Sequence, residues 1–344
     1  GEGGTRELFR YMAGGFTRSR VAGGQTSVAG VYGEAAWRAG PWLVAGGARL
    51  DHWNNTASRR IERDRSSGVV TLDERDPDRS GEVVSARLAV RWALGDDQSL
   101  RAAAYSGFRP ATLNELHRPF RVGNDLTEAN AALQPERLEG IEAGWAFEGE
   151  RLHLDATVFA TRLENAIVNV TIGMGPGTFP RAGFVPAGGV LRQRRNAGVI
   201  SAEGLELTAR FEATAALSLR AAVSATDARL DGGDQAAQLT GRRPAQAPIW
   251  SATAGADWTP RDRLTVSADL RWESRRFGDD LNSQVLDPAF VADVRADWRL
   301  NDHAGVYVAL LNAFDEDVQT ATTATGVDSL GPPRTIVFGL RWVR

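Results

Sequence analysis

The stretch DRLTVSADLRWES, residues 262–274, decides the fold, because apolar and polar side chains alternate along it. The apolar set is Leu264, Val266, Ala268, Leu270 and Trp272, and the polar set is Arg263, Thr265, Ser267, Asp269, Arg271 and Glu273. A β-strand sends successive side chains to opposite faces, so this pattern predicts one apolar face and one charged face. Repeated around a closed sheet, it describes a wall with lipid outside and water inside.

The same alternation, in stronger or weaker form, predicts 14 strands along the chain. They lie near residues 6–14, 25–38, 42–54, 82–94, 98–108, 136–148, 151–164, 198–213, 216–229, 248–259, 262–274, 289–300, 303–312 and 333–343. Both faces of the 303–312 segment are largely apolar, so its pattern is the poorest. Most segments are longer than an ordinary globular strand and match the roughly 9–11 residues that a tilted strand needs to cross a bilayer.

The connections between these segments alternate in length. Short turns are expected at residues 39–41, 95–97, 148–150, 213–215, 259–261 and 300–302, and long polar loops near 55–81, 109–135, 165–197, 230–247, 275–288 and 313–332. In an up-and-down barrel this order places all short turns at one rim and all long loops at the other, as in outer-membrane barrels. A soluble sandwich with Greek-key connections has no reason to follow it.

Tryptophans on the apolar faces support a membrane location. Trp250 and Trp258 are eight residues apart on one face, which is roughly 26 Å along a strand and near 20 Å along the membrane normal after tilting. That separation matches two aromatic girdles at the bilayer surfaces. Two core tryptophans of a soluble sheet are the alternative interpretation.

Composition excludes several classes of protein. The chain has 344 residues, 42% of them hydrophobic, a net charge of −3 and no cysteine. Disulfides and thiolate metal sites are therefore impossible, and the near-neutral charge argues against a nucleic-acid partner. The 40 basic residues are all arginine. No run of about 18 apolar residues occurs, so no membrane-spanning helix is expected.

Four stretches, each at a predicted strand–loop border, give the chain a family resemblance. They are YSGFRPATLNEL (105–116) with LQPE (133–136), RNAG (195–198) with EGLEL (203–207), RPAQAP (243–248), and LNAFDE (311–316) with GPPRT (331–335). In this order they resemble the barrel of TonB-dependent outer-membrane receptors. The family has a plug and a TonB-binding box before a barrel that the resemblance implies to be 22-stranded.

The resemblance implies that residues 1–344 form one domain, the C-terminal part of such a barrel, without a plug and with about 14 strands. A complete 14-stranded barrel is the alternative, because even strand numbers close well. The implied location is the bacterial outer membrane, with lipid around the barrel. The implied energy source is the inner-membrane TonB complex, acting through the plug, so this segment alone is not expected to support active uptake.

The resemblance also implies transport of a large scarce nutrient, with a ferric siderophore first and cobalamin, haem or a glycan after it. Arginines and aromatic residues in two long loops suit an anionic aromatic chelate. The candidate ligand-binding residues are Arg109, His117, Arg118, Phe120, Arg121, Arg192, Arg194 and Arg195. A solvated loop surface is the plainer interpretation of any single one. The charges of the loop at 58–79 are interpreted as solvated.

No catalytic chemistry is expected. The four histidines have no metal-ligand spacing, and neither a nucleophile elbow nor a phosphate loop followed by a helix occurs. Neither metal nor cofactor is therefore predicted. Two alternatives to the receptor remain: a self-contained passive porin or hydrophobic-solute channel, and a soluble all-β binding protein.

Overall fold

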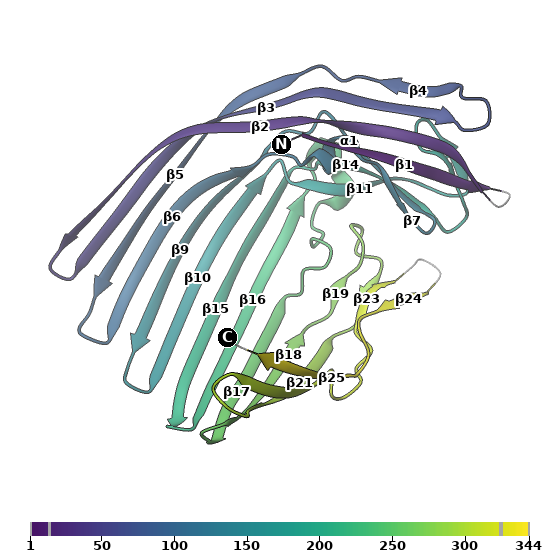
Figure 1. Cartoon of the computed structure of the whole chain (residues 1–344). Coiled ribbons are helices and arrows are strands. Elements are labelled where there is room, and N and C mark those ends of the chain that lie inside the picture. The colour runs from purple at the N-terminus through teal and green to yellow at the C-terminus, as the bar shows by residue number, and fades with distance from the viewer. Residues whose placement is uncertain (1, 13–14, 323–325, 343–344) are drawn as a thin grey trace.

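The computed structural model describes residues 2–12, 15–322 and 326–342. One antiparallel sheet of 15 strands dominates it (Figure 1); β4 (Val70–Glu74) pairs only with β3, and the others follow chain order. Those others are β1 (Glu2–Met12), β2 (Gly15–Ala39), β3 (Trp42–Asp64), β5 (Arg79–Ala93), β6 (Gln98–Arg109), β9 (Glu136–Glu148), β10 (Leu152–Glu164), β15 (Val199–Thr214), β16 (Leu217–Asp231), β17 (Trp250–Arg261), β18 (Leu264–Glu273), β21 (Ala289–Arg299), β22 (Ala304–Leu311) and β25 (Thr335–Trp342). The predicted all-β, up-and-down fold is confirmed, and every predicted segment overlaps one of these strands.

Cross-strand register keeps the two faces of the sheet separate. Ala254 lies opposite Leu270 on one face, and Asp257 lies opposite Ser267 on the other. Directly opposed residues point to the same side, so the alternation seen in one strand continues across its neighbours. We call the two sides the apolar face and the charged face. Figure 1 shows the short turns along one rim of the sheet.

The tryptophans of the apolar face are exposed rather than packed in a core. Trp258 is 50% exposed and Trp298 is 56% exposed. Near the rim of short turns, Trp42 and Trp92 stack with ring centroids 5.2 Å apart. An apolar face that no other described segment covers fits a sheet that faces lipid and does not fit the core of a soluble globule.

The hairpin of β2 and β3, which we call the first hairpin, differs from its prediction. Strand β2 has 25 residues and β3 has 23, so both extend far beyond the predicted segments 25–38 and 42–54. The region 55–81 was expected to be one long solvated loop, and that expectation is wrong. Its first ten residues, 55–64, continue β3, which pairs with β4, with a bulge next to Ala57, whose φ is 53°. Arg60 and Glu62 are buried there.

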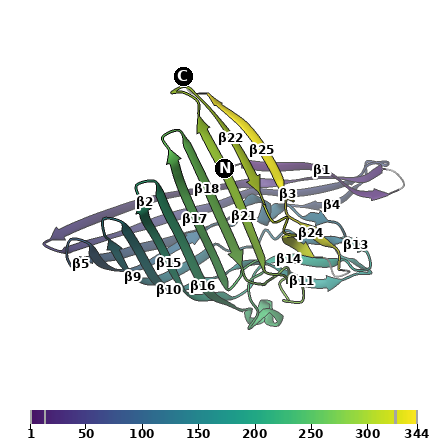
Figure 2. The ribbon, with the colours of Figure 1, turned by 90° about the horizontal axis from the view of Figure 1, so that it is seen from below.

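The other long loops contain short elements of their own. Helix α1 (Leu113–His117) begins at Thr112, which forms a reciprocal capping box with Glu115. Strands β7 (Phe120–Val122), β8 (Asp125–Glu128), β11 (Ile167–Met174) and β14 (Val190–Asn196) form a four-stranded sheet that we call the loop sheet. Small hairpins pair β12 (Gly177–Phe179) with β13 (Gly183–Val185), β19 (Arg276–Phe277) with β20 (Val285–Leu286), and β23 (Gln319–Thr322) with β24 (Asp328–Leu330). Figure 2 shows loop elements gathered at the end opposite the short turns.

The buried apolar clusters lie in these loops and at the strand ends beside them. One contains Val170, Ala197, Leu230, Ala236 and Leu239. A second contains Ala111, Leu116 and Leu133, and a third Leu126, Val185 and Leu191. The loops therefore have cores of their own and form a folded layer rather than separate flexible segments.

Among the described residues, none of the helices has the length and apolarity needed to cross a membrane. The strands β1 and β25 are the two edges of the main sheet, and no ladder joins them in the described part of the chain.

Candidate ligand-binding site

The loop layer rests on the charged face of the long first hairpin through a buried group of charges. Arg60 pairs with Glu62 at 2.7 Å and with Glu128 of the loop sheet at 2.6 Å. Arg20 pairs with Glu62 at 2.8 Å and donates to the carbonyl of Pro119 at 3.2 Å. All four residues are at most 6% exposed. We call Arg20, Arg60, Glu62 and Glu128 the buried ion network.

His117 fits into the same junction. Its ring lies against Gly24 of β2, where a Cβ atom would come within 2.6 Å of Nε2. Its Nδ1 lies 3.3 Å from the Ser58 hydroxyl, and its buried Nε2 has no hydrogen-bond partner among the described residues. Burial lowers the pKa of His117, although the nearby Asp76 carboxylate acts to raise it. His117 therefore packs at the junction between α1 and β2.

Three of the predicted arginines hold carboxylates of the chain. Arg109 pairs with Glu115 and Glu136, at 2.9 and 2.5 Å. Arg118 pairs with Glu7 at 2.5 Å. Arg192 pairs with Asp125 at 2.9 Å and lies 3.7 Å from Asp280. Their charges are therefore partly neutralised, and each one fastens a loop to a neighbouring segment.

The other three arginines have no carboxylate within 4 Å in the described part of the chain. Arg121 donates to the carbonyls of Asn124 and Phe184 at 3.4 and 3.2 Å. Arg195 donates to the side chain of Gln193 at 2.9 Å and to the carbonyl of Gln235 at 3.2 Å. Carbonyl oxygens orient a guanidinium without cancelling its charge, so these arginines keep a full positive charge for an anion.

Arg194 has the most developed surroundings of these three. It donates to the carbonyls of Asn114 and Arg118, and its guanidinium carbon lies 5.1 Å from the centroid of the Phe120 ring. Burial lowers the pKa of Arg194, the Glu115 carboxylate acts to raise it and the Arg118 charge to lower it, but an arginine stays protonated.

The structure brings Arg118, Phe120 and Arg194 together beside α1, with Arg109 next to them through Glu115. We call Arg118, Phe120 and Arg194 the α1 cluster. Arg121, the middle residue of β7, turns toward the carbonyl of Phe184 instead, and Arg195 points from β14 toward the residues that follow β16. The eight predicted residues therefore form several sites rather than one.

Charged residues also line the wall of the main sheet. Arg101 pairs with Asp155, Arg220 with Asp269, Arg271 with Asp293 and Arg295 with Asp297. A depression of about 310 Å³ on the charged face lies among Tyr32, Glu34, Arg49, Arg87 and Tyr105. This wall is polar and wettable, as in the interior of a transport barrel.

Sequence reasoning missed the buried ion network. Arg20 lies outside every predicted strand, and Arg60 and Glu62 were interpreted as solvated loop charges. Arg60 and Glu62 share a parity within residues 59–64, but five of those six residues are charged, so the local sequence does not indicate a buried face. Burial of a charge depends on a partner from far along the chain, here Glu128, and no local pattern records that partner.

A family model described as "TonB dependent receptor-like, beta-barrel" matches residues 4–313. The chain belongs to the TonB-dependent receptors. This family consists of outer-membrane β-barrels that serve as receptors and transporters. The predicted family is confirmed.

Curated relatives of this receptor chain carry the name "Vitamin B12 transporter BtuB". The protein of Photobacterium profundum is 26% identical over 263 residues, which are 76% of this chain and 38% of that protein. The protein of Vibrio vulnificus is 23% identical over 305 residues, 83% of this chain and 44% of that protein. The chain thus spans about two-fifths of the length of these relatives.

Solved structures share the fold. The ferric yersiniabactin uptake receptor FyuA of Yersinia pestis has a TM-score of 0.73 at 16% identity, covering 95% of this chain and 47% of that one. The ferric-catecholate import receptor Fiu of Escherichia coli K12 has a TM-score of 0.69 at 20% identity, covering 96% and 47%. At such identities the likeness shows the fold alone.

Proposed function

We propose that residues 1–344 form the barrel region of an outer-membrane receptor that binds and imports a large anionic metal chelate, a ferric siderophore before others. The α1 cluster carries this proposal. Arg194 keeps its charge above the Phe120 ring, and Arg118 lies beside it. A guanidinium next to an aromatic ring binds anionic, ring-bearing ligands through charge-assisted hydrogen bonds and stacking.

The receptor's location and partners follow from the same proposal. Lipid of the outer membrane covers the apolar face, and the inner-membrane TonB complex supplies the energy through a plug domain. Two of the proteins with this fold are described as importing ferric siderophores, ferric yersiniabactin and a ferric catecholate. Their ligands support the proposed substrate class without fixing the substrate.

A corrinoid is the second candidate, because both curated relatives are named vitamin B12 transporters. A passive porin has less support. A self-contained barrel of these strands needs β1 to pair with β25, and the described residues form no such ladder.

The test measures ligand binding by the purified chain in detergent, with quenching of its tryptophan fluorescence as the signal. The probes are an anionic ferric tris-catecholate, a neutral ferric hydroxamate and cyanocobalamin. We expect the anionic chelate to bind most tightly, and Arg194→Gln to weaken it roughly tenfold, since a charge-assisted hydrogen bond contributes about 1.5–3 kcal/mol.

Arg271→Gln is the matched control. Arg271 is an exposed arginine of the charged face on β18, where it pairs with Asp293 of β21, and its substitution should leave chelate binding unchanged. Tighter binding of cyanocobalamin than of either chelate would support the corrinoid instead. Equal loss in Arg194→Gln and Arg271→Gln would remove the α1 cluster from the proposal.

A further inference from the structure

Three arginines of the charged face reach partners two strands away, and each does so across a glycine. Arg220 on β16 lies directly opposite Gly255 on β17, and Gly255 lies directly opposite Asp269 on β18. Arg220 and Asp269 pair at 2.5 Å, although their strands do not pair with each other. Strands two places apart in a sheet are separated by roughly 10 Å. The arginine side chain therefore lies flat over the middle strand.

Arg101 has the same arrangement on the preceding strands. It lies on β6 opposite Gly144 on β9, which lies opposite Thr157 on β10. Arg101 donates to the Thr157 hydroxyl at 2.5 Å and pairs with Asp155 of the same strand at 2.5 Å. Its guanidinium is thus held by two groups on the far side of β9.

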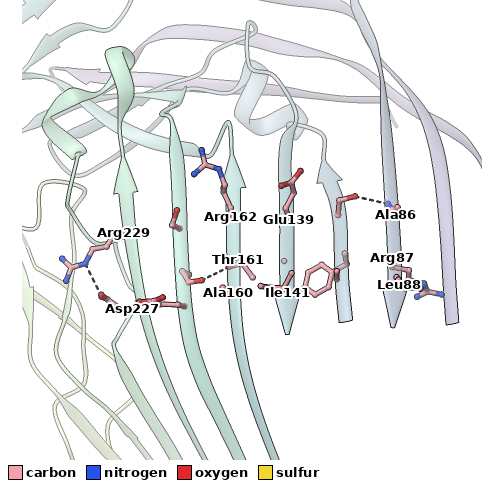
Figure 3. Close-up of a pocket in the computed structure, with 17 residues that line it drawn as sticks. Ala86, Arg87, Leu88, Glu139, Ile141, Ala160, Thr161, Arg162, Asp227 and Arg229 are labelled. Atoms are coloured by element: carbon pink, nitrogen blue, oxygen red, sulfur yellow. Dashed lines mark hydrogen bonds and ion pairs between the residues drawn. The ribbon is translucent and has the colours of Figure 1, made fainter. Parts of the chain in front are cut away.

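Arg87 provides the third case, beside the first hairpin. It lies on β5 opposite Gly47 on β3, and it pairs at 2.8 Å with Glu34 on β2, which lies opposite the same glycine. Figure 3 shows the Arg87 side chain turned sideways along the sheet toward the neighbouring strand. Three rows of the charged face therefore follow one order: an arginine, a glycine and an acceptor on the third strand.

The arginines occupy space that any other residue in place of the glycine would fill. A Cβ atom on Gly255 would lie 2.5 Å from Nε of Arg220, and one on Gly144 would lie 2.7 Å from Cζ of Arg101. Both contacts are too short for close-packed atoms, so the flexible arginine would have to move away. At Gly47 the nearest atoms are 3.1 Å away, which is a milder contact. We call Gly144 and Gly255 the seat glycines.

Arginines of the same face that have no such glycine stay close to their own strand. Arg91 lies directly opposite Arg101 on one side and Leu43 on the other, and within the described ranges it forms no ion pair. Two others pair within a single strand: Arg49 with Asp51 and Arg295 with Asp297. The opposing glycine thus decides whether an arginine of this face reaches across the sheet.

The loops and the wall use arginine in opposite ways. In the α1 cluster, Arg194 donates to carbonyl oxygens and keeps its charge for an anion. On the wall, Arg220 pairs with both Asp257 and Asp269, so this group of three side chains carries a net negative charge. Such a group repels an anion, and its flat arginine leaves no projecting cation.

We propose that the seat glycines keep this part of the wall from retaining anions. They let Arg101 and Arg220 lie flat and pair with wall carboxylates, so that an anionic solute released from the α1 cluster passes without binding again. The seat glycines are positioning residues, because they act through the arginines and touch no solute. The passage of a solute rests on the proposed import of an anionic chelate, whereas the seating of the arginines does not.

Phenylglyoxal, which modifies accessible guanidinium groups, reports the seating without any chelate. With the full chain in detergent and peptide mass spectrometry as the readout, we expect Arg220 to react more slowly than Arg91. Gly255→Ala should speed up modification of Arg220 roughly fivefold, the factor that an exposed ion pair contributes. Gly107→Ala is the matched control, because this glycine also lies on the charged face and has nothing within 4 Å of its Cβ position. Unchanged modification of Arg220 in Gly255→Ala, or equal acceleration in Gly107→Ala, would overturn the seating.

A designed seat tests the same idea by gain instead of loss. Arg38 on β2 lies opposite Leu43, on the side away from Arg91. Arg38→Glu therefore places a carboxylate two strands from Arg91 with a leucine between them. We expect Arg91 to stay reactive in Arg38→Glu and to become roughly fivefold less reactive in Leu43→Gly/Arg38→Glu. Equal reactivity in these two variants would count against the glycine.

Retention of an anion is measured in the Arg194→Gln background, where the α1 cluster is weakened. The anionic ferric tris-catecholate should bind roughly fivefold more tightly to Gly144→Ala/Gly255→Ala/Arg194→Gln than to Arg194→Gln, because the freed arginines offer charge-assisted hydrogen bonds. The neutral ferric hydroxamate should show no gain. Faster arginine modification without tighter chelate binding would overturn the role of the wall. Failure of the proposed transport function would appear instead as absent chelate binding by the unaltered chain, and it would leave the phenylglyoxal result intact.

Discussion

At the scale of single residues, the feature with the largest energetic consequence is the buried ion network. A buried ion pair is weak as a source of net stability, because desolvation offsets most of the attraction. Removing one partner is costly, since the other charge then stays buried without compensation. The network therefore fixes the position of the loop sheet on the first hairpin, an effect that we call the lock. Any other position of the loop sheet would leave a buried charge without its partner.

Glu128→Gln tests this lock. We expect docking of β8 to lose about 3 kcal/mol, because Arg60 would keep its burial and lose a full carboxylate. Hydrogen exchange of the β8 amides should then speed up roughly a hundredfold. Glu34→Gln is the control, because its pair with Arg87 is exposed and contributes at most about 1 kcal/mol. Unchanged exchange in Glu128→Gln would contradict the lock.

His117 makes the same junction sensitive to pH. Its pKa is lowered by burial, so the neutral form is favoured in the folded state and the unfolded state binds more protons below its ordinary value of about 6.5. Stability is therefore full above that value and falls as the pH drops toward the lower folded pKa. The protection factors of the α1 amides, which are corrected for the intrinsic pH dependence of exchange, should fall between pH 7.5 and 5.5, with a smaller change in His117→Gln. Identical profiles for the two proteins would refute it.

At the scale of elements, the strands within the membrane were predictable and their extensions were not. Apolar and polar side chains alternate regularly where one face of this sheet meets lipid and the other meets water. In residues 15–24 neither face meets lipid, and the sequence there is rich in glycine and arginine without a parity. The α1 cluster was predictable as a set of residue types, but the pairing of Arg109, Arg118 and Arg192 with carboxylates depends on contacts between distant loops.

The lipid-facing assignment can be tested within one strand. Ala254 lies midway between Trp250 and Trp258 on the apolar face, and Thr253 next to it points to the charged face. Arginine at a lipid-facing position near the bilayer midplane costs about 2–4 kcal/mol. We expect Ala254→Arg to lower the free energy of unfolding in liposomes by that amount, and Thr253→Arg to lower it much less. Reversed costs for the two variants would invert the assignment of the faces.

At the scale of the whole molecule, the loops form one connected layer. Arg192 joins Asp125 of β8 to Asp280 of the loop between β18 and β21. Further along, Arg276 donates to the carbonyl of Gln319 at 2.8 Å, and Asn282 donates to that of Arg243 at 2.9 Å. Loops that belong to different hairpins thus share hydrogen bonds, so we expect local unfolding of one loop to weaken the contacts of its neighbour.

Arg192→Met measures that connection. We expect faster amide exchange in both β8 and residues 279–284, because one side chain holds the two segments. Arg162→Met, an exposed arginine outside the loop layer, is the control and should change neither. Faster exchange confined to β8 would show that the loops open separately.

The unequal lengths of the strands have a consequence for how a solute arrives. Strand β2 has 25 residues, whereas β22 and β25 have eight each. At about 3.3 Å per residue, the first hairpin stands tens of ångströms above a membrane that needs only about 9–11 residues to cross. The described sheet is therefore tall at β2 and β3 and short at β22 and β25. The tall β2–β3 hairpin blocks a solute that diffuses toward the charged face from its side, whereas the short β22 and β25 leave the opposite side open. Solutes are therefore expected to reach this part of the charged face mainly from the side of β22 and β25.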